Sequence, residues 1–136
     1  MQRHKVIPRG IRNNNPLNIR IGNVWLGETN VSTDPDFEQF VAMKYGLRAA
    51  FVILRRYIRR YGRNTVRLIV SAWAPANENK TEAYIDYVAS HLQICPDDPI
   101  RYEDKKTMTL LVYHMAMYEN GQPIDLNQIK LSYDLA

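Results

Sequence analysis

The sequence predicts one domain, over residues 1–136, that is mainly α-helical and carries a small β-hairpin near its N-terminus. The first observation is length, because 136 residues are enough for one hydrophobic core but not for two. The second is spacing, because apolar residues recur at helical intervals through most of the chain after residue 45. The third is composition, since 46% hydrophobic and 24% charged residues are ordinary for a folded globular protein.

The segment over residues 10–45 predicts turns and short strands rather than helices. Asn13–Pro16 is a turn cluster, in which the proline forces the residue before it into an extended conformation. Residues 18–21 and 23–26 have strand-like composition on either side of a glycine, which predicts the hairpin. Residues 33–36 form a second turn.

Helices are expected over most of the remaining chain. The second of these helices in chain order begins at a cap formed by Asn64–Thr65. It ends at Pro75, because proline cannot continue a helix. The others are expected over residues 46–61, 81–92, roughly 105–119 and 126–133. A loop rich in proline and aspartate precedes the helix at 105–119.

The helix at 105–119 ends on a carboxylate in an unusual place. Its apolar stripe contains Met108, Leu111, Val112 and Met115, and Glu119 is the next position of that stripe. The segment is apolar nearly all round, which indicates a buried helix, and Gly121 supplies a left-handed stop. Burial and the negative end of the helix dipole both raise the pKa of a carboxyl group, as a proton donor requires. The structural alternative is an exposed or ion-paired glutamate at a helix end.

Composition excludes several classes of site. The single cysteine, Cys95, excludes an intramolecular disulfide, and no cysteine or histidine cluster has zinc spacing, so neither metal nor cofactor is expected. His114 is interpreted as a core histidine. No apolar stretch has transmembrane length and no signal peptide is present, so we expect no membrane insertion, and another machinery must carry the protein if it acts outside the cytoplasm.

The charge suits a polyanionic partner. A net charge of +4 fits either nucleic acid or an anionic cell-wall polymer. Arginines crowd the first two helices of the series, at Arg48, Arg55, Arg56, Arg59, Arg60, Arg63 and Arg67. They can grip phosphates, or they can form a solvated face with salt bridges. No helix-turn-helix or other nucleic-acid-reading module is present, so nucleic acid is not the expected partner.

Several polar segments resemble a known family. They cover residues 9–20, 73–84 and 114–121, together with the shorter segments 25–27, 36–40 and 45–49. These segments resemble phage- and prophage-encoded, virion-associated proteins assigned to the lysozyme-like peptidoglycan hydrolases, including lytic transglycosylases. The resemblance runs from Arg9 to about Gly121, and its most specific part is the string Gly-Ile-Arg-Asn-Asn-Asn-Pro-x-Asn-Ile-Arg. Leu17 departs from the family pattern, which usually has glycine there.

The order of the segments is a second point of resemblance. Residues 15–20 followed by 25–27 are similar to the stretch that follows the catalytic glutamate in flagellar-type glucosaminidases. There the glutamate helix comes first, whereas here it comes last. The resemblance therefore implies a lysozyme-like fold in circularly permuted form, which neighbouring termini make feasible, with Glu119 in the general-acid position. A Glu119 that pointed away from Asn18 and Trp25 would exclude this arrangement.

The resemblance implies cleavage of the peptidoglycan glycan strand by a muramidase or a lytic transglycosylase. A transglycosylase needs only Glu119, because the hydroxyl of the sugar itself attacks. A two-carboxylate hydrolase needs another acid, and the candidates are Glu28, Asp34 and Glu78. Glu28 follows the predicted hairpin, where lysozyme-like folds often carry a second acid. Glu78 precedes a helix start, where the dipole favours an ionised, positioning carboxylate.

The resemblance also implies substrate-binding residues and a setting. The candidates are Asn18, Arg20, Trp25, Tyr45, Trp73, Asn79 and Tyr84, of which the aromatic residues are sugar platforms or core residues. The expected partners are peptidoglycan glycan strands and other virion or secretion-machinery proteins. The expected location is the virion, or the cell wall or periplasm after delivery by another machinery. The alternative function is a non-catalytic structural or wall-binding protein of the virion or secretion apparatus that retains the fold.

Overall fold

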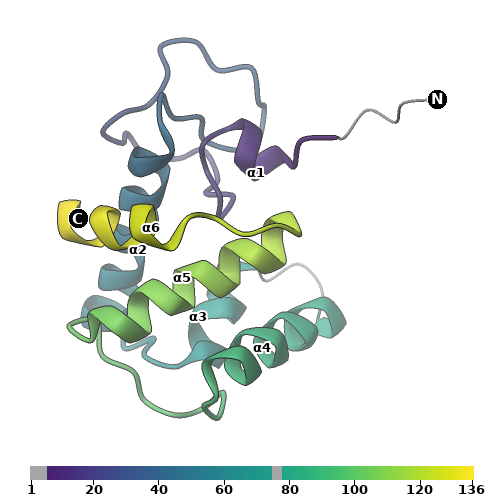
Figure 1. Ribbon diagram of the computed structural model, residues 1–136, viewed down its shortest axis with the longest axis vertical. Helices are drawn as coiled ribbons and strands as arrows, with labels where there is room; N and C mark the ends of the chain where they lie inside the picture. Colours follow the sequence, from purple (N-terminus) through teal and green to yellow (C-terminus); the bar gives the residue numbers. More distant parts are fainter. Residues whose placement is uncertain (1–5, 75–77) are drawn as a thin grey trace.

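A computed structural model describes residues 6–74 and 78–136, except for the side chains of residues 78 and 79. This part of the chain is mainly helical, as predicted (Figure 1). Its helices are α1 (Arg9–Arg12), α2 (Met43–Tyr61), α3 (Val66–Trp73), α4 (Glu78–Leu92), α5 (Lys105–Asn120) and α6 (Leu126–Leu135). The described helices do not include one long and apolar enough to cross a membrane.

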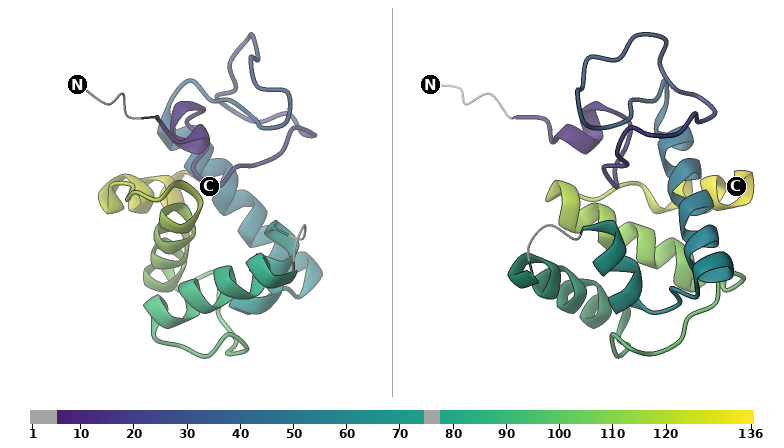
Figure 2. Two further views of the ribbon diagram at one scale, coloured as in Figure 1. Left: turned by 90° about the vertical axis from the view of Figure 1, so that its right-hand side faces the viewer. Right: turned by 180° about the vertical axis from the view of Figure 1, so that it is seen from behind.

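Two regions differ in architecture, and they are called lobes below. The irregular lobe comprises residues 9–42, and the helical lobe comprises the helices from α2 onward. Figures 1 and 2 show the irregular lobe at one end of the molecule, above α3, α4 and α5, and they show α2 running from it into the helical lobe. The C-terminal end of α5 meets the irregular lobe directly, since the Asn120 side chain donates a 2.8 Å hydrogen bond to the carbonyl of Pro16.

The predicted hairpin between residues 18–21 and 23–26 is wrong. Two isolated antiparallel bridges occur instead, between Arg20 and Phe37 and between Glu28 and Phe40. The chain bends after Arg20, so its pairing partner comes from a segment much later in the sequence. Local strand composition predicted pairing, but the tertiary contacts of the lobe selected a different neighbour.

Asparagine side chains explain this choice of neighbour. The buried Asn15 amide nitrogen donates 3.0 Å hydrogen bonds to the carbonyls of both Ile19 and Glu38, which holds the two segments side by side. Its oxygen accepts from the Ile19 N–H at 2.9 Å. The Asn14 side chain donates to the Phe40 carbonyl at 2.9 Å. These amides therefore supplement the few main-chain hydrogen bonds between the segments, such as the 2.9 Å bond from the Glu38 N–H to the Ile19 carbonyl, and their polarity serves the fold.

An ion pair between a half-exposed arginine and a buried aspartate closes the same lobe. Arg9 binds both carboxylate oxygens of Asp34 at 2.6 Å, and Asn13 donates to Asp34 at 2.9 Å. The Arg9 guanidinium holds the pKa of Asp34 well below its usual range. Arg9 lies on α1, a single helical turn that the sequence did not predict because it is too short for apolar periodicity. Packing against α5 stabilises α1.

The helical lobe follows its predicted pattern closely. The stripe of Met108, Leu111, Val112 and Met115 is fully buried, as predicted. Helix α5 packs against α4, α6 and α1, while α6 covers α2. The predicted caps are also confirmed, since Thr65 accepts from the Leu68 N–H at 3.1 Å and Gly121 is left-handed with a φ of 69°. Helix α4 begins at Glu78, earlier than the predicted Thr81.

One glycine fixes how closely the lobes approach. A Cβ atom on Gly46, in the first turn of α2, would collide with the backbone carbonyl of Asn14. The absence of a side chain therefore lets α2 lie directly against the asparagine turn. This contact anchors the irregular lobe on the first turn of α2.

Candidate functional site

Glu119 lies at the junction of the two lobes. Its carboxylate accepts a 2.8 Å hydrogen bond from the side chain of Asn18, 101 positions away in the sequence. Asn18 is left-handed, with a φ of 53°, a conformation that asparagine adopts more readily than most residues. Its backbone N–H bonds to the Asn15 carbonyl at 3.0 Å and closes the turn. Glu119 therefore faces Asn18, as the permuted arrangement requires.

The surroundings of Glu119 shift its protonation in the predicted direction. The side chain is half-buried in the last turn of α5. Burial raises the pKa of Glu119 above its ordinary value, and hydrogen bonds from Asn18 and Tyr84 oppose that rise without cancelling it. The site therefore holds a carboxyl group that keeps its proton to a higher pH than an exposed glutamate does.

Two tyrosines form a wall beside this carboxyl group. Tyr84 of α4 is 2% exposed, and its ring stacks on Tyr118 of α5 with centroids 4.2 Å apart. Burial and the neighbouring Glu119 raise the pKa of Tyr84 well above its ordinary value. The Tyr84 hydroxyl therefore stays protonated, and it also lies 3.4 Å from the Met115 carbonyl. Tyr84 is thus a neutral donor in contact with the acid.

A cavity of about 260 Å³ opens in front of Glu119. Five of the residues predicted for the site line it together, namely Asn18, Arg20, Trp73, Tyr84 and Glu119. Its other lining residues are Phe37, Ala74, Lys80, Thr81 and Tyr118. The sequence analysis did not single these out, although all of them lie inside the polar segments that carried the family resemblance.

Trp73 is held in place by the turn of the irregular lobe. Its indole N–H donates a 2.7 Å hydrogen bond to the carbonyl of Leu17, and its ring meets Tyr57 edge-on with centroids 5.8 Å apart. The left-handed residue of the turn is Asn18 and not Leu17. Leucine therefore fits where the family pattern has glycine, and its side chain is fully buried.

The cavity continues past Trp73 into a second hollow of about 330 Å³. Asn18, Arg20 and Trp73 line both hollows, so the two are parts of one groove. The remaining lining residues of the second part are Ile19, Asn23, Ile53, Arg56, Tyr57, Tyr61 and Ala72. Both lobes contribute to it. A groove with this combined volume is suited to a ligand larger than one sugar unit.

The candidate second acids do not join Glu119 among the described residues. Glu28 accepts a 2.9 Å hydrogen bond from the Trp25 backbone N–H and lies beside Glu38, away from the groove lining. Burial and the neighbouring Glu28 raise the pKa of Glu38 to about 7. Asp34 is engaged by Arg9, as described above. Glu119 is therefore the one carboxylate in the described lining of either hollow.

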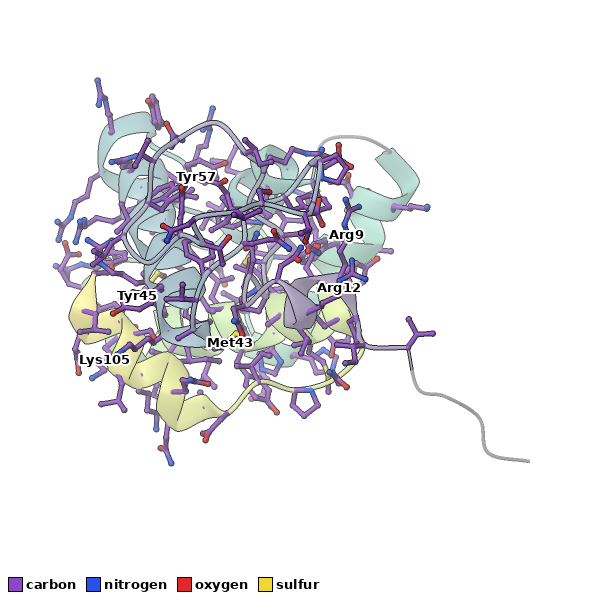
Figure 3. The ribbon with its side chains drawn as sticks, turned by 90° about the horizontal axis from the view of Figure 1, so that it is seen from above. Arg9, Arg12, Met43, Tyr45, Tyr57 and Lys105 are labelled. Atoms are coloured by element: carbon purple, nitrogen blue, oxygen red, sulfur yellow. The ribbon has the colours of Figure 1, made fainter. Side chains whose placement is uncertain are left out.

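Several predicted site residues lie elsewhere or outside the described part of the chain. The side chains of Glu78 and Asn79 belong to the latter group. Trp25 is 7% exposed and belongs to the core. Tyr45 covers Gly27, where a Cβ atom would collide with the tyrosine ring. Seen from above, Tyr45 and Tyr57 leave α2 at different places, and only Tyr57 lines the groove (Figure 3).

The predicted basic face is partly consumed by ion pairs. Arg67 binds Asp97 at 2.9 Å and Glu82 at 3.0 Å, and Arg59 binds Glu103 at 2.7 Å. These two arginines fit the alternative of a solvated face with salt bridges, whereas the other five form no salt bridge within the described part of the chain. His114 is half-buried beside His91, and the described residues contain no group of three or more side chains able to hold a metal ion.

Comparison with known proteins places the chain beside a phage protein. It is 38% identical over 131 residues to Protein P5 of Pseudoalteromonas phage PM2, and the match spans 93% of this chain and 80% of the relative. No family model matches the chain. The phage origin of this relative agrees with the phage character that the sequence analysis expected.

Proposed function

The chain belongs to the same family as Protein P5 of phage PM2, and we propose that this member cleaves the glycan strand of peptidoglycan with Glu119 as general acid. The observation that carries the proposal is the half-buried Glu119 carboxyl group, which has a raised pKa and opens onto a groove. Glycoside cleavage requires such a protonated carboxyl group beside the scissile oxygen.

The reaction we propose is that of a lytic transglycosylase. Glu119 donates its proton to the glycosidic oxygen as the bond to the anomeric carbon breaks. The resulting carboxylate then accepts the proton of a hydroxyl group on the same sugar, whose oxygen attacks the anomeric carbon and closes an anhydro ring. These reaction steps need one carboxylate, which agrees with the single carboxylate in the described lining.

The neighbours of Glu119 have roles in this proposal. Hydrogen bonds from Asn18 and Tyr84 orient the carboxyl group and stabilise its anionic form after proton transfer. Trp73 and Tyr118 offer aromatic faces to the sugar rings. Because these side chains come from both lobes, the relative placement of the lobes determines the geometry of the acid.

The finer architecture and setting belong to the same proposal. A lysozyme-like fold in circularly permuted form is supported by the contact between the turn at Asn18 and the end of a glutamate helix that follows this turn in the chain. The phage relative supports a location in the virion, or at the cell wall after delivery by other phage components.

Digestion of purified peptidoglycan by wild type and Glu119→Gln tests the proposal. We expect the wild type to release muropeptides with anhydro ends, identified by mass spectrometry, and the variant to be slower by at least about a hundredfold. Glu103→Gln is the matched control, since this glutamate is exposed and its partner is Arg59.

The other outcomes are equally informative. Equal digestion by wild type and Glu119→Gln would transfer the acid role to Glu78 or Glu28. Products with hydrolysed reducing ends would indicate a muramidase. No products from a folded wild type would favour the structural or wall-binding alternative.

A further inference from the structure

We propose that the part of the groove beyond Trp73 binds the acidic peptide stems that branch from the glycan strand. This part is called the basic subsite below and is defined by Arg20, Asn23, Arg56, Tyr57 and Tyr61. The inference rests on the proposed function and adds the feature of the substrate that the second hollow recognises.

The basic subsite is continuous with the acid. Asn18 bonds to Glu119 at 2.8 Å and lines both hollows, as do Arg20 and Trp73. A glycan strand positioned for cleavage at Glu119 therefore places the substituents of a neighbouring sugar at Trp73 and beyond. The two hollows, of about 260 and 330 Å³, give room for a sugar and for a branch.

The charge of the subsite is positive and uncompensated. Its described lining contains two arginines and no carboxylate. Within the described part of the chain, neither Arg20 nor Arg56 forms a salt bridge, whereas Arg59 on the same helix is paired with Glu103. The Arg20 guanidinium lies 5.1 Å from the Phe37 ring centroid, and that of Arg56 lies 5.7 Å from the ring of Trp25. Aromatic contacts thus orient both cations without neutralising them.

A further arginine adds to the field from behind the lining. The Arg63 guanidinium lies 4.9 Å from the ring of Tyr57 and 5.0 Å from that of Tyr61. Both rings line the subsite, so Arg63 adds positive charge next to the aromatic groups that a ligand there contacts. This arrangement favours an anionic group on a ligand that also has apolar parts.

The chemistry of the strand identifies that anionic group. The N-acetylated sugar rings carry no charge, so unpaired guanidinium groups are not required to bind them. The peptide stems carry carboxylates and are attached to the lactyl groups of alternate sugars. The planar guanidinium of arginine binds a carboxylate through two parallel hydrogen bonds. A stem on the sugar next to the cleaved bond therefore satisfies both the position and the charge of the subsite.

Phosphate groups of nucleic acid are the competing ligand for arginines. The basic subsite favours the peptide, because Arg20 and Arg56 are the two cations in its described lining, while Arg59 and Arg67 are paired with carboxylates. A nucleic-acid surface requires several unpaired cations in a row to follow the backbone. The binding experiment must therefore distinguish nucleic acid from the peptide stems as the ligand of these arginines.

The test compares glycan strands whose stems keep their free carboxylates with the same strands after these carboxylates have been converted to primary amides. For Arg56→Gln we expect the KM for the carboxylate-bearing strands to rise about tenfold at unchanged kcat, and the KM for the amidated strands to stay unchanged. Arg56→Lys keeps the charge but loses the paired donors, so its KM should lie between those of the wild type and Arg56→Gln. Arg101→Gln, in the exposed loop before α5, is the matched control.

Binding gives a readout that is independent of cleavage. Glu119→Gln protein, with and without Arg56→Gln, is titrated with a tetrasaccharide that carries stem carboxylates, with the same tetrasaccharide after amidation of its stems, and with a single-stranded oligonucleotide. Preference for the carboxylate-bearing ligand, abolished by Arg56→Gln, supports the subsite even if the wild type cleaves nothing, in which case only the proposed function fails. Equal binding of both tetrasaccharides, or tighter Arg56-dependent binding of the oligonucleotide, overturns the subsite.

Discussion

Each lobe is stabilised internally by a different kind of interaction. In the helical lobe, main-chain hydrogen bonds lie within the helices and apolar packing joins them, as in the fully buried stripe of α5. In the irregular lobe, side-chain amides of Asn14 and Asn15 bind backbone carbonyls and add to the few main-chain hydrogen bonds around two isolated bridges. The comparison teaches that a run of polar residues can stabilise a fold. Removing one of these side chains should therefore destabilise mainly the lobe that contains it.

Functional residues come from both kinds of structure. Glu119 is held by a helix, so its position is set by the packing of α5. Asn18 is held by a turn, so its position depends on the amide of Asn15 and the hydrogen bonds around it. A change in either lobe therefore alters the same contact between Asn18 and Glu119, but through a different physical cause.

The largest expected effect comes from shortening one buried side chain in each lobe. Asn15→Ala removes three buried hydrogen bonds, and Leu111→Ala leaves a cavity in the helical core, so each should lower the free energy of unfolding by about 3–5 kcal/mol. Hydrogen exchange should show that Asn15→Ala exposes amides near Ile19 and Phe40 while α5 stays protected, whereas Leu111→Ala lowers protection in α5. Equal loss of protection throughout both lobes in the Asn15 variant would contradict the comparison.

A smaller effect concerns pH and the carboxyl pair of the irregular lobe. The pKa of Glu38 is raised to about 7 in the folded protein, above its ordinary value of 4.5. The folded state therefore binds more protons than the unfolded state between these values, and stability falls as pH rises from about 4.5 to about 7. Glu38→Gln should remove this loss and raise the stability at pH 8 by roughly 2 kcal/mol.

Denaturant unfolding at pH 5 and pH 8 measures this difference. Glu28→Gln is the matched variant, because it removes the neighbouring carboxylate while Glu38 stays buried, and it should give a smaller gain. If wild type and Glu38→Gln lose the same stability between pH 5 and pH 8, the pair does not titrate as described.

The smallest effect concerns the contact between the lobes. The hydrogen bond from Asn18 favours the charged form of Glu119, so Asn18→Ala should raise the pKa of Glu119 further. Because the acid must be protonated to act, the alkaline limb of the pH–rate profile of peptidoglycan cleavage should move to higher pH in the variant. Asn23→Ala, at the far end of the groove, should leave the limb in place. A shift to lower pH would show that Asn18 stabilises the protonated form instead.

The sequence by itself determined the helices from α2 onward, because helical periodicity is a local property that a stretch of residues carries wherever it folds. It also determined that Glu119 ends a buried stripe, since the burial of α5 and its glycine stop are both written in neighbouring residues. The direction of the Glu119 pKa follows from that position alone, because burial penalises the charged form.

Only the tertiary structure decided which distant segments meet. Pairing of Arg20 with Phe37 in place of a local hairpin depends on the Asn15 amide, which can bind any carbonyl that the fold presents. The contact of Asn18 with Glu119 and the entry of Arg56 into the groove likewise join segments that share no periodic pattern. Hydrogen bonds and charges act over short distances in space, and distance in space is set by the packing of the whole chain.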